Sequence, residues 1–545
     1  MRRLSEHYGE LLRAIVSDEE QAIDRLPLLG AAEKALLLQG WEGRRQPNEV
    51  RRLHELFERQ AERTPQALAV LSTQEGQGSW SYAELNDRAN ALAHHLIGLG
   101  VGREALVGVC MQRSMHTVVA LLGIAKAGGA YLPLDPSYPE ERLAFMLEDS
   151  AARWVIVDRE AREAMRTWGA GATGVAVLCL EEEPLQALWS GPAKGNPCVG
   201  VEPKDLVQAR DRMLFKTSIS FDPALVEMLV PLHVGAAVVV LQAGEERDSA
   251  SVIEAIGEHG VTVLQVVPSA LKAMLAEPDL SGCASLRYIV CGGEALERSL
   301  ASEVVRKLKV RIGNFYGPTE TSIDATCLPD VDISGVGATV PIGRPVDNMH
   351  CYVLDGHGEP APIGVIGELY VGGVGVARGY LNRPELTAER FVADPFREGG
   401  RLYRTGDLAR WRAEGTLEFM GRVDHQVKLR GFRIELDEIQ CALNDCHGVR
   451  ESLAVLQELS PGHPRLVAFL VGEGVRTEAV RAQLKQRLPE HMLPSAITVL
   501  PAFPLTPNGK IDRAALLALS ARDRSSGQRG DDLPDDPLER LLARV

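Results

Sequence analysis

The sequence predicts an α/β protein with a large and a small domain, because it is long, alternates helical with strand-like segments, and changes pattern near residue 425. Its 545 residues exceed what one hydrophobic core usually holds. From about 50 to 420, helical stretches such as AELNDRANALAHHLIGLG alternate with short apolar runs such as ALVGVCM, WVIVD and AAVVVL. Such alternation indicates largely parallel, buried sheets.

The remaining segments predict smaller units. Residues 1–45 are expected to form an amphipathic helix and a linker. Between about 340 and 420, the runs HCYVLD, GELYVGG and TLEFMG predict a small antiparallel or barrel-like unit. From about 425 to 520, a new set of strands and helices predicts a compact α+β domain. Residues 521–545 contain a polar linker and the start of a helix, PLERLLARV.

Composition and charge limit the classes of function. A formal net charge of −15 disfavours a nucleic-acid partner, because phosphate backbones are bound by clustered Lys and Arg. No apolar run of about 18 residues and no signal peptide are present, so we expect a cytoplasmic protein without a membrane partner. Nine cysteines without a CxxC pair or a suitably spaced His predict free thiols. Small molecules or proteins are the expected partners.

The segment NFYGPTETS, residues 314–322, follows a strand-like run and contains a Gly-Pro turn signal. It is either a plain loop or part of a nucleotide site. In the second interpretation Tyr316 packs on a base, Thr319 bonds a phosphate oxygen, and Glu320 holds Mg²⁺.

Two further segments each contain one charged residue that is a candidate for substrate binding. LYRTGDLAR, residues 402–410, predicts a strand ending in a turn that presents Asp407, either to solvent or to the hydroxyls of a ribose. PLTPNGKIDR, residues 504–513, places Lys510 after an Asn-Gly turn. That ammonium is either solvated or able to reach a substrate carboxylate and an α-phosphate together.

The segment GRVDHQVKLRGFRIELDEIQ, residues 421–440, predicts two alternating strands that pivot on Gly431. Asp424 lies at the expected boundary between the large and small domains and is a candidate hinge. The glycines of GGVGVARGYLNRP lack the G-x-G-x-x-G spacing, which excludes a dinucleotide site there.

Together these segments resemble, in order and spacing, the core motifs of the adenylate-forming, AMP-binding enzyme superfamily, and closely those of nonribosomal peptide synthetase adenylation domains. The likeness spans about 50–520 and includes WSYAELNDRANALA, LLGIAKAGGAYLPLDPSYPEERLAFML, SISFDPALVEML, NFYGPTETS, LYRTGDLARW, GRVDHQVKLRGFRIELDEI and NGKIDR. The fold it implies is a large N-terminal domain of two α/β sheets plus a small β-barrel, hinged to a small, mobile α+β C-terminal domain.

The resemblance also implies a division of the chain. Residues 1–45 resemble the tail of a condensation domain with its linker, 46–423 the large adenylation subdomain, 424–520 the mobile subdomain, and 521–545 a linker with the start of a truncated carrier domain. The implied reaction joins an amino acid to ATP with Mg²⁺, giving aminoacyl-AMP and pyrophosphate. The aminoacyl group then passes to the phosphopantetheine thiol of a carrier domain. The first step depends mainly on positioning and charge stabilisation.

Site residues follow from the resemblance, motif by motif. Asp222 is expected to pair with the substrate ammonium and Lys510 with its carboxylate; the expected catalytic residues are Lys510, Glu320 and Thr319. The nucleotide contacts implied are adenine at Asn314 and Tyr316, ribose at Asp407, ribose or phosphate at Arg422, metal at Glu320, and an adjoining Gly293. The implied side-chain pocket consists of Pro223, Val226, Gln265, Val290, Gly292, Phe315, Ile323 and Asp324.

The pocket residues point to more than one class of substrate. Asp324 indicates a substrate with a hydrogen-bond donor or a cation, whereas Pro223 with Gln265 resembles pockets for β-amino or aromatic acids. The sequence therefore does not decide which amino acid is activated.

One departure from the family pattern affects the expected activity. Members carry a Ser/Thr/Gly-rich loop ending in Pro-Lys-Gly before the segment that matches SISFD, whereas here VEPKDLV, ending at Val207, runs directly into QARDRMLFKTSISFD. We expect the loop, the strand before it and the helix after it to be missing. Because such a loop cradles the β- and γ-phosphates, pyrophosphate departure is expected to be poorly stabilised and sheet edges to be open.

Two alternatives to an active adenylating enzyme remain at this point. One is a degenerate remnant that binds a nucleotide or a partner domain without catalysis. The other is an acyl-CoA or aryl-acid ligase of the same superfamily, which Asp222 disfavours because its carboxylate has no use opposite a substrate without an amine.

Overall fold

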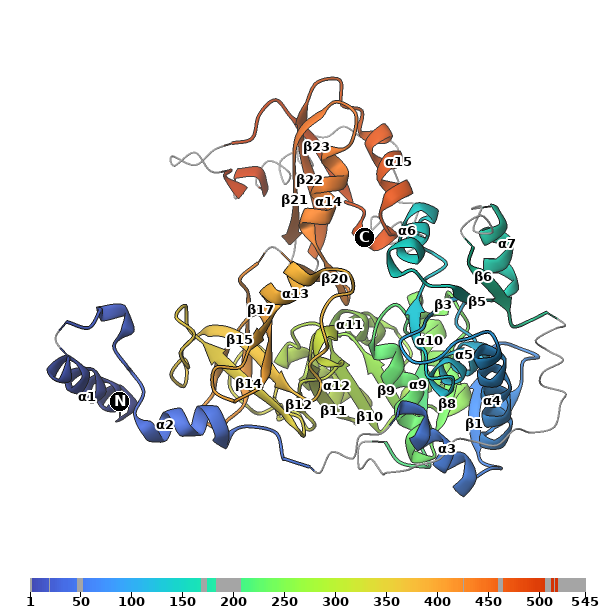
Figure 1. The fold of residues 1–545 in the computed structure, drawn as a ribbon, viewed down its shortest axis with the longest axis horizontal. Helices are drawn as coiled ribbons and strands as arrows, with labels where there is room; N and C mark the ends of the chain where they lie inside the picture. The colour runs from blue at the N-terminus through green and yellow to red at the C-terminus, as the bar shows by residue number, and fades with distance from the viewer. Residues whose placement is uncertain are drawn as a thin grey trace. The chain divides into compact units, whose positions relative to one another are not determined.

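The computed structural model describes residues 2–18, 20–46, 52–167, 174–182, 207–424, 426–458, 464–504, 511–513 and 515–517. The chain divides into two compact units, the first ending at Arg433 and the second beginning at Ile434 (Figure 1). Lys510 and the predicted carrier-domain start lie outside the described residues.

The first unit contains two largely parallel sheets. The nine-stranded sheet has the order β13 (Arg344–Pro345), β12 (Thr326–Leu328), β11 (Arg311–Tyr316), β10 (Tyr288–Gly292), β9 (Val263–Val266), β7 (Arg212–Phe215), β8 (Ala237–Val240), β1 (Leu68–Ser72) and β2 (Ser79–Ser81). Its interior pairs are parallel, and β2, β12 and β13 are antiparallel at the ends. The parallel four-stranded sheet has the order β4 (Ala130–Pro133), β3 (Leu106–Cys110), β5 (Trp154–Val157) and β6 (Ala176–Cys179).

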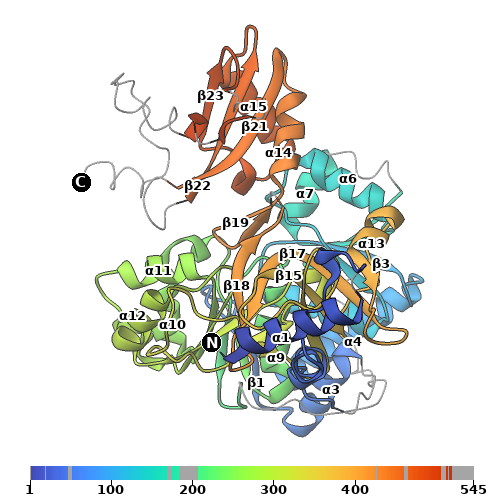
Figure 2. The ribbon, with the colours of Figure 1, turned by 90° about the vertical axis from the view of Figure 1, so that its left-hand side faces the viewer.

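Helices pack on both sheets of this unit, those at residues 140–150 and 159–167 on the smaller one. They are α3 (Leu53–Arg63), α4 (Tyr82–Gly98), α5 (Met115–Lys126), α6 (Glu140–Ser150), α7 (Arg159–Thr167), α9 (Pro223–Val234), α10 (Ser249–His259), α11 (Pro268–Ala276) and α12 (Arg298–Leu308). One core joins Val70 and Val238 of the large sheet to Val107 of the small one through Leu92 of α4 and Leu122 of α5. Helices α10, α11 and α12 lie together against the opposite face (Figure 2).

The large sheet is continuous where open edges were expected, so that expectation is wrong for the described strands. Strand β7 pairs along four residues with β8, and through Met213 and Val263 with β9. The chain that enters β7 is anchored, because Val207 is buried in the core under α9. Asp211 accepts hydrogen bonds from the Gln208 amide and from Arg287 Nε, each at 2.6 Å.

An antiparallel sheet stands at the place of the predicted barrel-like unit. Its strands are β14 (Met349–Leu354), β15 (Gly367–Gly373), β17 (Arg401–Trp411) and β16 (Phe391–Ala393), with β18 (Leu417–Arg422) paired to β17 and α13 (Pro384–Arg390) nearby in sequence. The predicted N-terminal helix and linker contain α1 (Arg2–Ser17), α2 (Ala31–Ala35) and a turn at Leu36–Gly40. Leu37 is buried in the core of this sheet, and the Trp41 and Trp411 ring centroids lie 4.9 Å apart. The linker therefore packs on the sheet.

The predicted hairpin forms from β19 (Val427–Leu429) and β20 (Phe432–Ile434). Both Arg430 and Gly431 have positive φ, at 53° and 81°, as a two-residue hairpin turn requires.

The second unit is α+β, as expected. It contains α14 (Leu436–Asn444), α15 (Thr477–Arg487) and a sheet of β21 (Val449–Glu458), β22 (Pro464–Gly472) and β23 (Ala496–Leu500). Short helical turns in the two units are η1 (Ile23–Arg25), η5 (Glu245–Arg247), η6 (Ser281–Ser285), η7 (Thr319–Thr321) and η8 (Glu490–Met492). Among the described residues, no helix is both long and apolar enough to cross a bilayer.

Candidate active site

The candidate site forms at the carboxyl ends of three neighbouring parallel strands, β9, β10 and β11. Parallel strands end at the same edge of a sheet, which is where α/β proteins usually bind ligands. Gly293 directly follows β10, and Tyr316 is the last residue of β11. The topology thus brings two separate sequence motifs to one edge.

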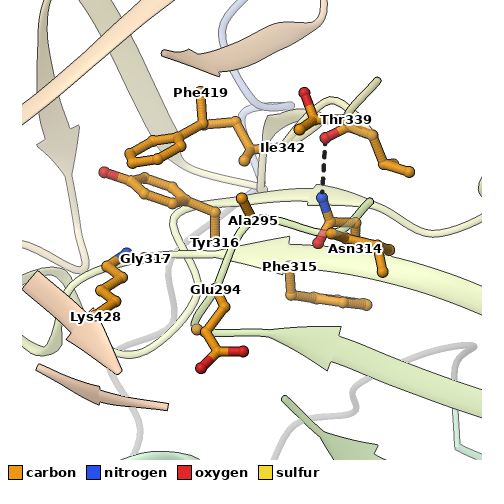
Figure 3. A pocket seen from close by; sticks show the side chains of 13 residues that line it. Glu294, Ala295, Asn314, Phe315, Tyr316, Gly317, Thr339, Ile342, Phe419 and Lys428 are labelled. Carbon is orange, nitrogen blue, oxygen red and sulfur yellow. Dashed lines mark hydrogen bonds between the residues drawn. The ribbon is translucent and has the colours of Figure 1, made fainter. Parts of the chain in front are cut away.

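A pocket lies at this edge and contains four of the predicted residues (Figure 3). Its lining consists of Gly293, Glu294, Ala295, Leu296, Asn314, Phe315, Tyr316, Gly317, Thr339, Val340, Ile342, Phe419 and Lys428. The rings of Tyr316 and Phe419 lie next to each other, and the Lys428 ammonium is 5.4 Å and 5.5 Å from their centroids. Burial lowers the pKa of Lys428, against the raising effect of Asp407. An aromatic wall beside a cation suits a base and its phosphate.

Asn314 is fixed in place within this pocket. Its side chain is buried, and its amide nitrogen donates to the Pro341 carbonyl at 2.9 Å and to Val340 at 3.4 Å. These bonds use the donor hydrogens of the amide and leave its oxygen to face other groups. The adenine contact remains a prediction.

Tyr316 connects the pocket to the two charged residues predicted for the ribose. Its hydroxyl donates to Asp407 Oδ2 at 2.5 Å, and Arg422 forms an ion pair with the same carboxylate. Burial, followed by the Asp407 charge, raises the pKa of Tyr316. Arg422 also donates to both oxygens of the predicted hinge residue, Asp424, at 2.7 Å. These four residues form a chain of contacts.

The predicted turn at Asp407 is wrong. Asp407 lies inside the continuous strand β17, at an irregularity where Gly406 has φ 72°. A Cβ atom on Gly406 would lie 2.7 Å from Asp424 Oδ2. The glycine therefore permits a local distortion of the backbone and the close approach of Asp424. Strand β17 continues through this distortion because β15 and β18 still pair with it on either side.

Glu320 accepts hydrogen bonds from two phenols and one guanidinium. Tyr380 and Tyr403 donate to Oε1 at 2.7 Å and 2.8 Å, and Arg433 Nη1 lies 3.0 Å from Oε2. Burial acts to raise the pKa of Glu320, but Arg433 and the two hydroxyls lower it overall. The predicted metal ligand is thus an ionised carboxylate that already has a cation beside it.

Asp222 is the N-cap residue of α9 but does not cap the helix with its side chain. An aspartate at this position usually accepts a hydrogen bond from the first helical turn. Here Oδ2 is buried with no hydrogen-bond partner among the described residues. Burial raises the pKa of Asp222, whereas the Thr319 hydroxyl opposes the shift. This carboxylate has no structural role that the described contacts explain.

The predicted side-chain pocket residues come from α9, from the neighbouring strands β9, β10 and β11, and from the segment after η7. Val226 of α9 packs on a core that contains Val290 of β10 and Phe315 of β11. Gln265 of β9 is the register partner of Val290, and Gly292 is the partner of Phe315. Pro223 is the first residue of α9, while Ile323 and Asp324 follow η7. The fold therefore brings these residues to one region.

Asp324 carries a pH-dependent prediction. Burial, followed by the charge of Asp222, raises its pKa from 3.8 to about 7; Cys327 is the other titratable neighbour. Between about pH 4 and 7 the folded protein then holds a proton that the unfolded chain has lost, so the free energy of unfolding falls as pH rises. Urea unfolding at pH 5 and pH 8 should show a smaller fall for Asp324→Asn. An equal fall in both proteins contradicts the assignment.

Several site residues escaped the sequence-based prediction. They are Glu294, Thr339, Phe419 and Lys428 of the pocket, and Tyr380, Tyr403 and Arg433 around Glu320. Lys428, Tyr403 and Arg433 lie inside motifs that carry the resemblance, but a single Lys, Tyr or Arg does not indicate which distant atoms it meets. Lys510 lies outside the described residues, so its expected role is untested.

The sequence matches the family described as AMP-binding enzyme at residues 57–207 and 196–381, and the AMP-binding enzyme C-terminal domain at 438–510. The chain therefore belongs to the AMP-binding enzyme family. The two matches to the first family model overlap at residues 196–207, next to the position where family members carry the Ser/Thr/Gly-rich loop.

More specifically, its relatives are nonribosomal peptide synthetases. It is 37% identical over 541 residues to tyrocidine synthase 3 of Brevibacillus parabrevis, covering 94% of this chain and 8% of that protein. It is 36% identical over 571 residues to a dimodular nonribosomal peptide synthase of Bacillus subtilis (strain 168), covering 98% of this chain and 23% of that one. The chain thus spans a small part of these curated relatives.

Solved structures confirm the predicted fold class. A holo NRPS protein containing adenylation and PCP domains, bound to a vinylsulfonamide inhibitor, matches with a TM-score of 0.74 and 26% identity, covering 89% of this chain and 86% of that one. A four-domain nonribosomal peptide synthetase bound to AMP and glycine matches with a TM-score of 0.67 and 28% identity, covering 98% and 41%.

Proposed function

We propose that this chain is an adenylation domain that activates an amino acid with ATP, forming aminoacyl-AMP and pyrophosphate. The observation that supports it most is the buried Asp222 carboxylate, which lacks a partner at Oδ2. It belongs to the same unit as the aromatic pocket on β10 and β11. An acid that pairs with an α-ammonium and a pocket for a nucleotide are the two elements such a reaction needs.

Different residues are proposed to bind the base, the ribose and the amino acid. Tyr316 and Phe419 form the wall against which a base packs, while Asp407, held by Tyr316 and Arg422, accepts ribose hydroxyls. Asp222 holds the ammonium of the amino acid. Lys510, by resemblance, meets the substrate carboxylate. Together these contacts position the carboxylate for attack on the α-phosphorus, and charge stabilisation lowers the barrier.

Mg²⁺ fits this site in one respect, since Glu320 supplies a single ionised carboxylate and Mg²⁺ commonly takes its other ligands from phosphates and water. No cluster of three or more metal-ligating side chains occurs in the part of the chain that the structure describes. Glu320 would hold the ion, which neutralises phosphate charge when bound. In this structure Arg433 Nη1 lies 3.0 Å from Glu320 Oε2, an oxygen that would otherwise be available to the ion.

Removing Arg433 should therefore strengthen Mg²⁺ binding. In Arg433→Met, Glu320 keeps its two phenol donors but loses the competing cation, so calorimetric titration of Mg²⁺ into the protein with saturating AMP should show an affinity about threefold to tenfold higher at low ionic strength. Arg378→Met, at a pair on the surface with Glu104, is the matched control. Equal Mg²⁺ affinity in all three proteins contradicts the competition.

The partners proposed are the amino-acid substrate, a carrier domain whose phosphopantetheine thiol receives the aminoacyl group, and a condensation domain next to residues 1–45. The solved relatives that combine adenylation and PCP domains support the carrier domain.

Two measurements test the function. Calorimetry with AMP should show binding at the Tyr316 pocket, and ATP–pyrophosphate exchange should depend on an amino acid. Because we expect the Ser/Thr/Gly-rich loop to be missing, exchange should be slow relative to complete family members. Failure to bind AMP, ATP or any aminoacyl-adenylate analogue overturns the proposal, whereas analogue binding without exchange identifies a domain that binds but does not turn over.

A further inference from the structure

Three side chains with oxygen acceptors come from segments that border the core between α9, β10 and β11: Asp222, Gln265 and Asp324, here called the acceptor cluster. Val290 and Phe315 share this core with the α9 residues Val226 and Val230. Asp222 comes from the start of α9, Gln265 from β9, and Asp324 from the segment after η7.

Gln265 faces the helix that carries Asp222. Residues two apart in a strand point to the same side, and Val263 of β9 packs in the same core as the α9 residues Val226 and Val230. Gln265 therefore projects toward α9, next to its register partner Val290. Its Oε1 atom is buried and has no hydrogen-bond partner among the described residues.

Asp324 lies on a segment that turns back toward the same core. Ser322 and Ile323 both have positive φ, at 63° and 76°, which turns the chain back after η7. Cys327, the antiparallel partner of Phe315, packs on the shared core. Asp324 is in electrostatic contact with Asp222. Within the described ranges neither carboxylate forms a salt bridge with Lys, Arg or His; burial and the charge of Glu320 raise the pKa of Asp222, and Arg433, which is paired with Glu320, opposes the shift.

This arrangement is costly without a ligand. Burying a carboxylate or an amide oxygen without a donor is unfavourable, and a second carboxylate nearby increases the cost. A substrate α-ammonium at Asp222 leaves the buried Gln265 Oε1 atom and the half-buried Asp324 carboxylate without a donor among the described residues. An apolar substrate side chain would leave both unpaired, and an acidic one would add a further negative charge. A protonated amine brings a positive charge and three donors.

We propose that the amino acid taken by this site has a basic side chain, whose cation is bound between Asp324 and Gln265 while its α-ammonium is bound by Asp222. This inference rests on the proposed function and narrows its substrate class to amino acids with a second cationic group.

Pairs of ligands that differ only in the basic group test the proposed substrate class separately from the proposed adenylation activity. Calorimetry with non-hydrolysable aminoacyl-adenylate analogues does not depend on turnover, and the pairs lysine and norleucine, and ornithine and norvaline, differ by the terminal amine alone. We expect each basic analogue to bind at least about tenfold more tightly than its apolar counterpart, because a site built for a polar group discriminates strongly against its absence. Glutamine supplies a neutral donor, and glutamate a negative charge.

The variants identify the residue responsible. Asp324→Asn keeps the shape and removes the charge, so it should reduce the ratio of lysine to norleucine affinity by about tenfold. Asp87→Asn, on the exposed side of α4, makes the same chemical change elsewhere and should leave the ratio unaltered. Norleucine or glutamine binding as tightly as lysine to the unaltered protein overturns the inference and leaves the proposed function standing. Binding of no analogue overturns both.

Discussion

Replacing Asp222 by asparagine is expected to weaken the binding of every aminoacyl-adenylate analogue by about a hundredfold, which corresponds to about 2.7 kcal/mol. The physical reason is that Asp222 Oδ2 has no partner in the described residues and no helix-capping bond. Its charge is therefore available to a ligand ammonium, and the loss of one partner of a desolvated charge pair typically costs about 2–5 kcal/mol.

Stability separates this loss of binding from misfolding. Because Asp222 is a buried carboxylate whose pKa burial raises, its neutral replacement should leave the urea midpoint at pH 7.5 unchanged or slightly higher. AMP affinity, measured by calorimetry, should also be preserved, since the nucleotide pocket does not include position 222. Unchanged analogue binding in Asp222→Asn would rule out this carboxylate as the ammonium site.

Replacing Asp407 by alanine should destabilise the fold and abolish AMP binding together. Asp407 is 2% exposed and balances Arg422, while also accepting the Tyr316 hydroxyl. Removing one partner of a buried ion pair costs about 3–5 kcal/mol. We expect the lower end of that range, because Asp424 remains paired with Arg422. Urea unfolding measures the stability, and calorimetry measures AMP affinity.

Tyr316→Phe is the matched control, because it removes one hydrogen bond and leaves the ion pair and the aromatic wall. Its cost should be about 1–2 kcal/mol, with AMP affinity largely retained. Asp407→Asn keeps the size of the side chain and should lose AMP affinity with less destabilisation than alanine. An Asp407→Ala protein that unfolds at the same urea concentration as the unaltered chain refutes the proposed structural role of this network.

Much of the fold follows from local pattern. The alternation of apolar runs with helical stretches predicts the two parallel sheets, and the HCYVLD, GELYVGG and TLEFMG runs become β14, β15 and β18. The positive φ at Gly431 agrees with the predicted hairpin pivot. The turn expected at Asp407 failed because a Gly-Asp pair marks a turn in sequence terms, whereas β15 and β18 on either side keep β17 extended.

The candidate site is less predictable than the fold. Glu320 was expected to be a metal ligand from its motif, but its present partner, Arg433, lies 113 residues away in sequence. Lys428 lies within the motif GRVDHQVKLRGFRIELDEI, yet its position beside the Tyr316 ring depends on the hairpin that carries it. No local pattern encodes such a contact.

The amino-acid sequence by itself determined the α/β class, the family, and the identity of the charged residues at 222, 320, 324 and 407, because periodicity and motif spacing are properties of neighbouring residues. Only the tertiary structure decided which of these charges are balanced. Tyr316 and Arg422 satisfy Asp407, and Arg433 satisfies Glu320, whereas Asp222 and Asp324 repel each other and neither forms a salt bridge with a described cation. The physical reason is that the energy of a charge depends on the groups within a few ångströms of it, and folding alone brings those groups together.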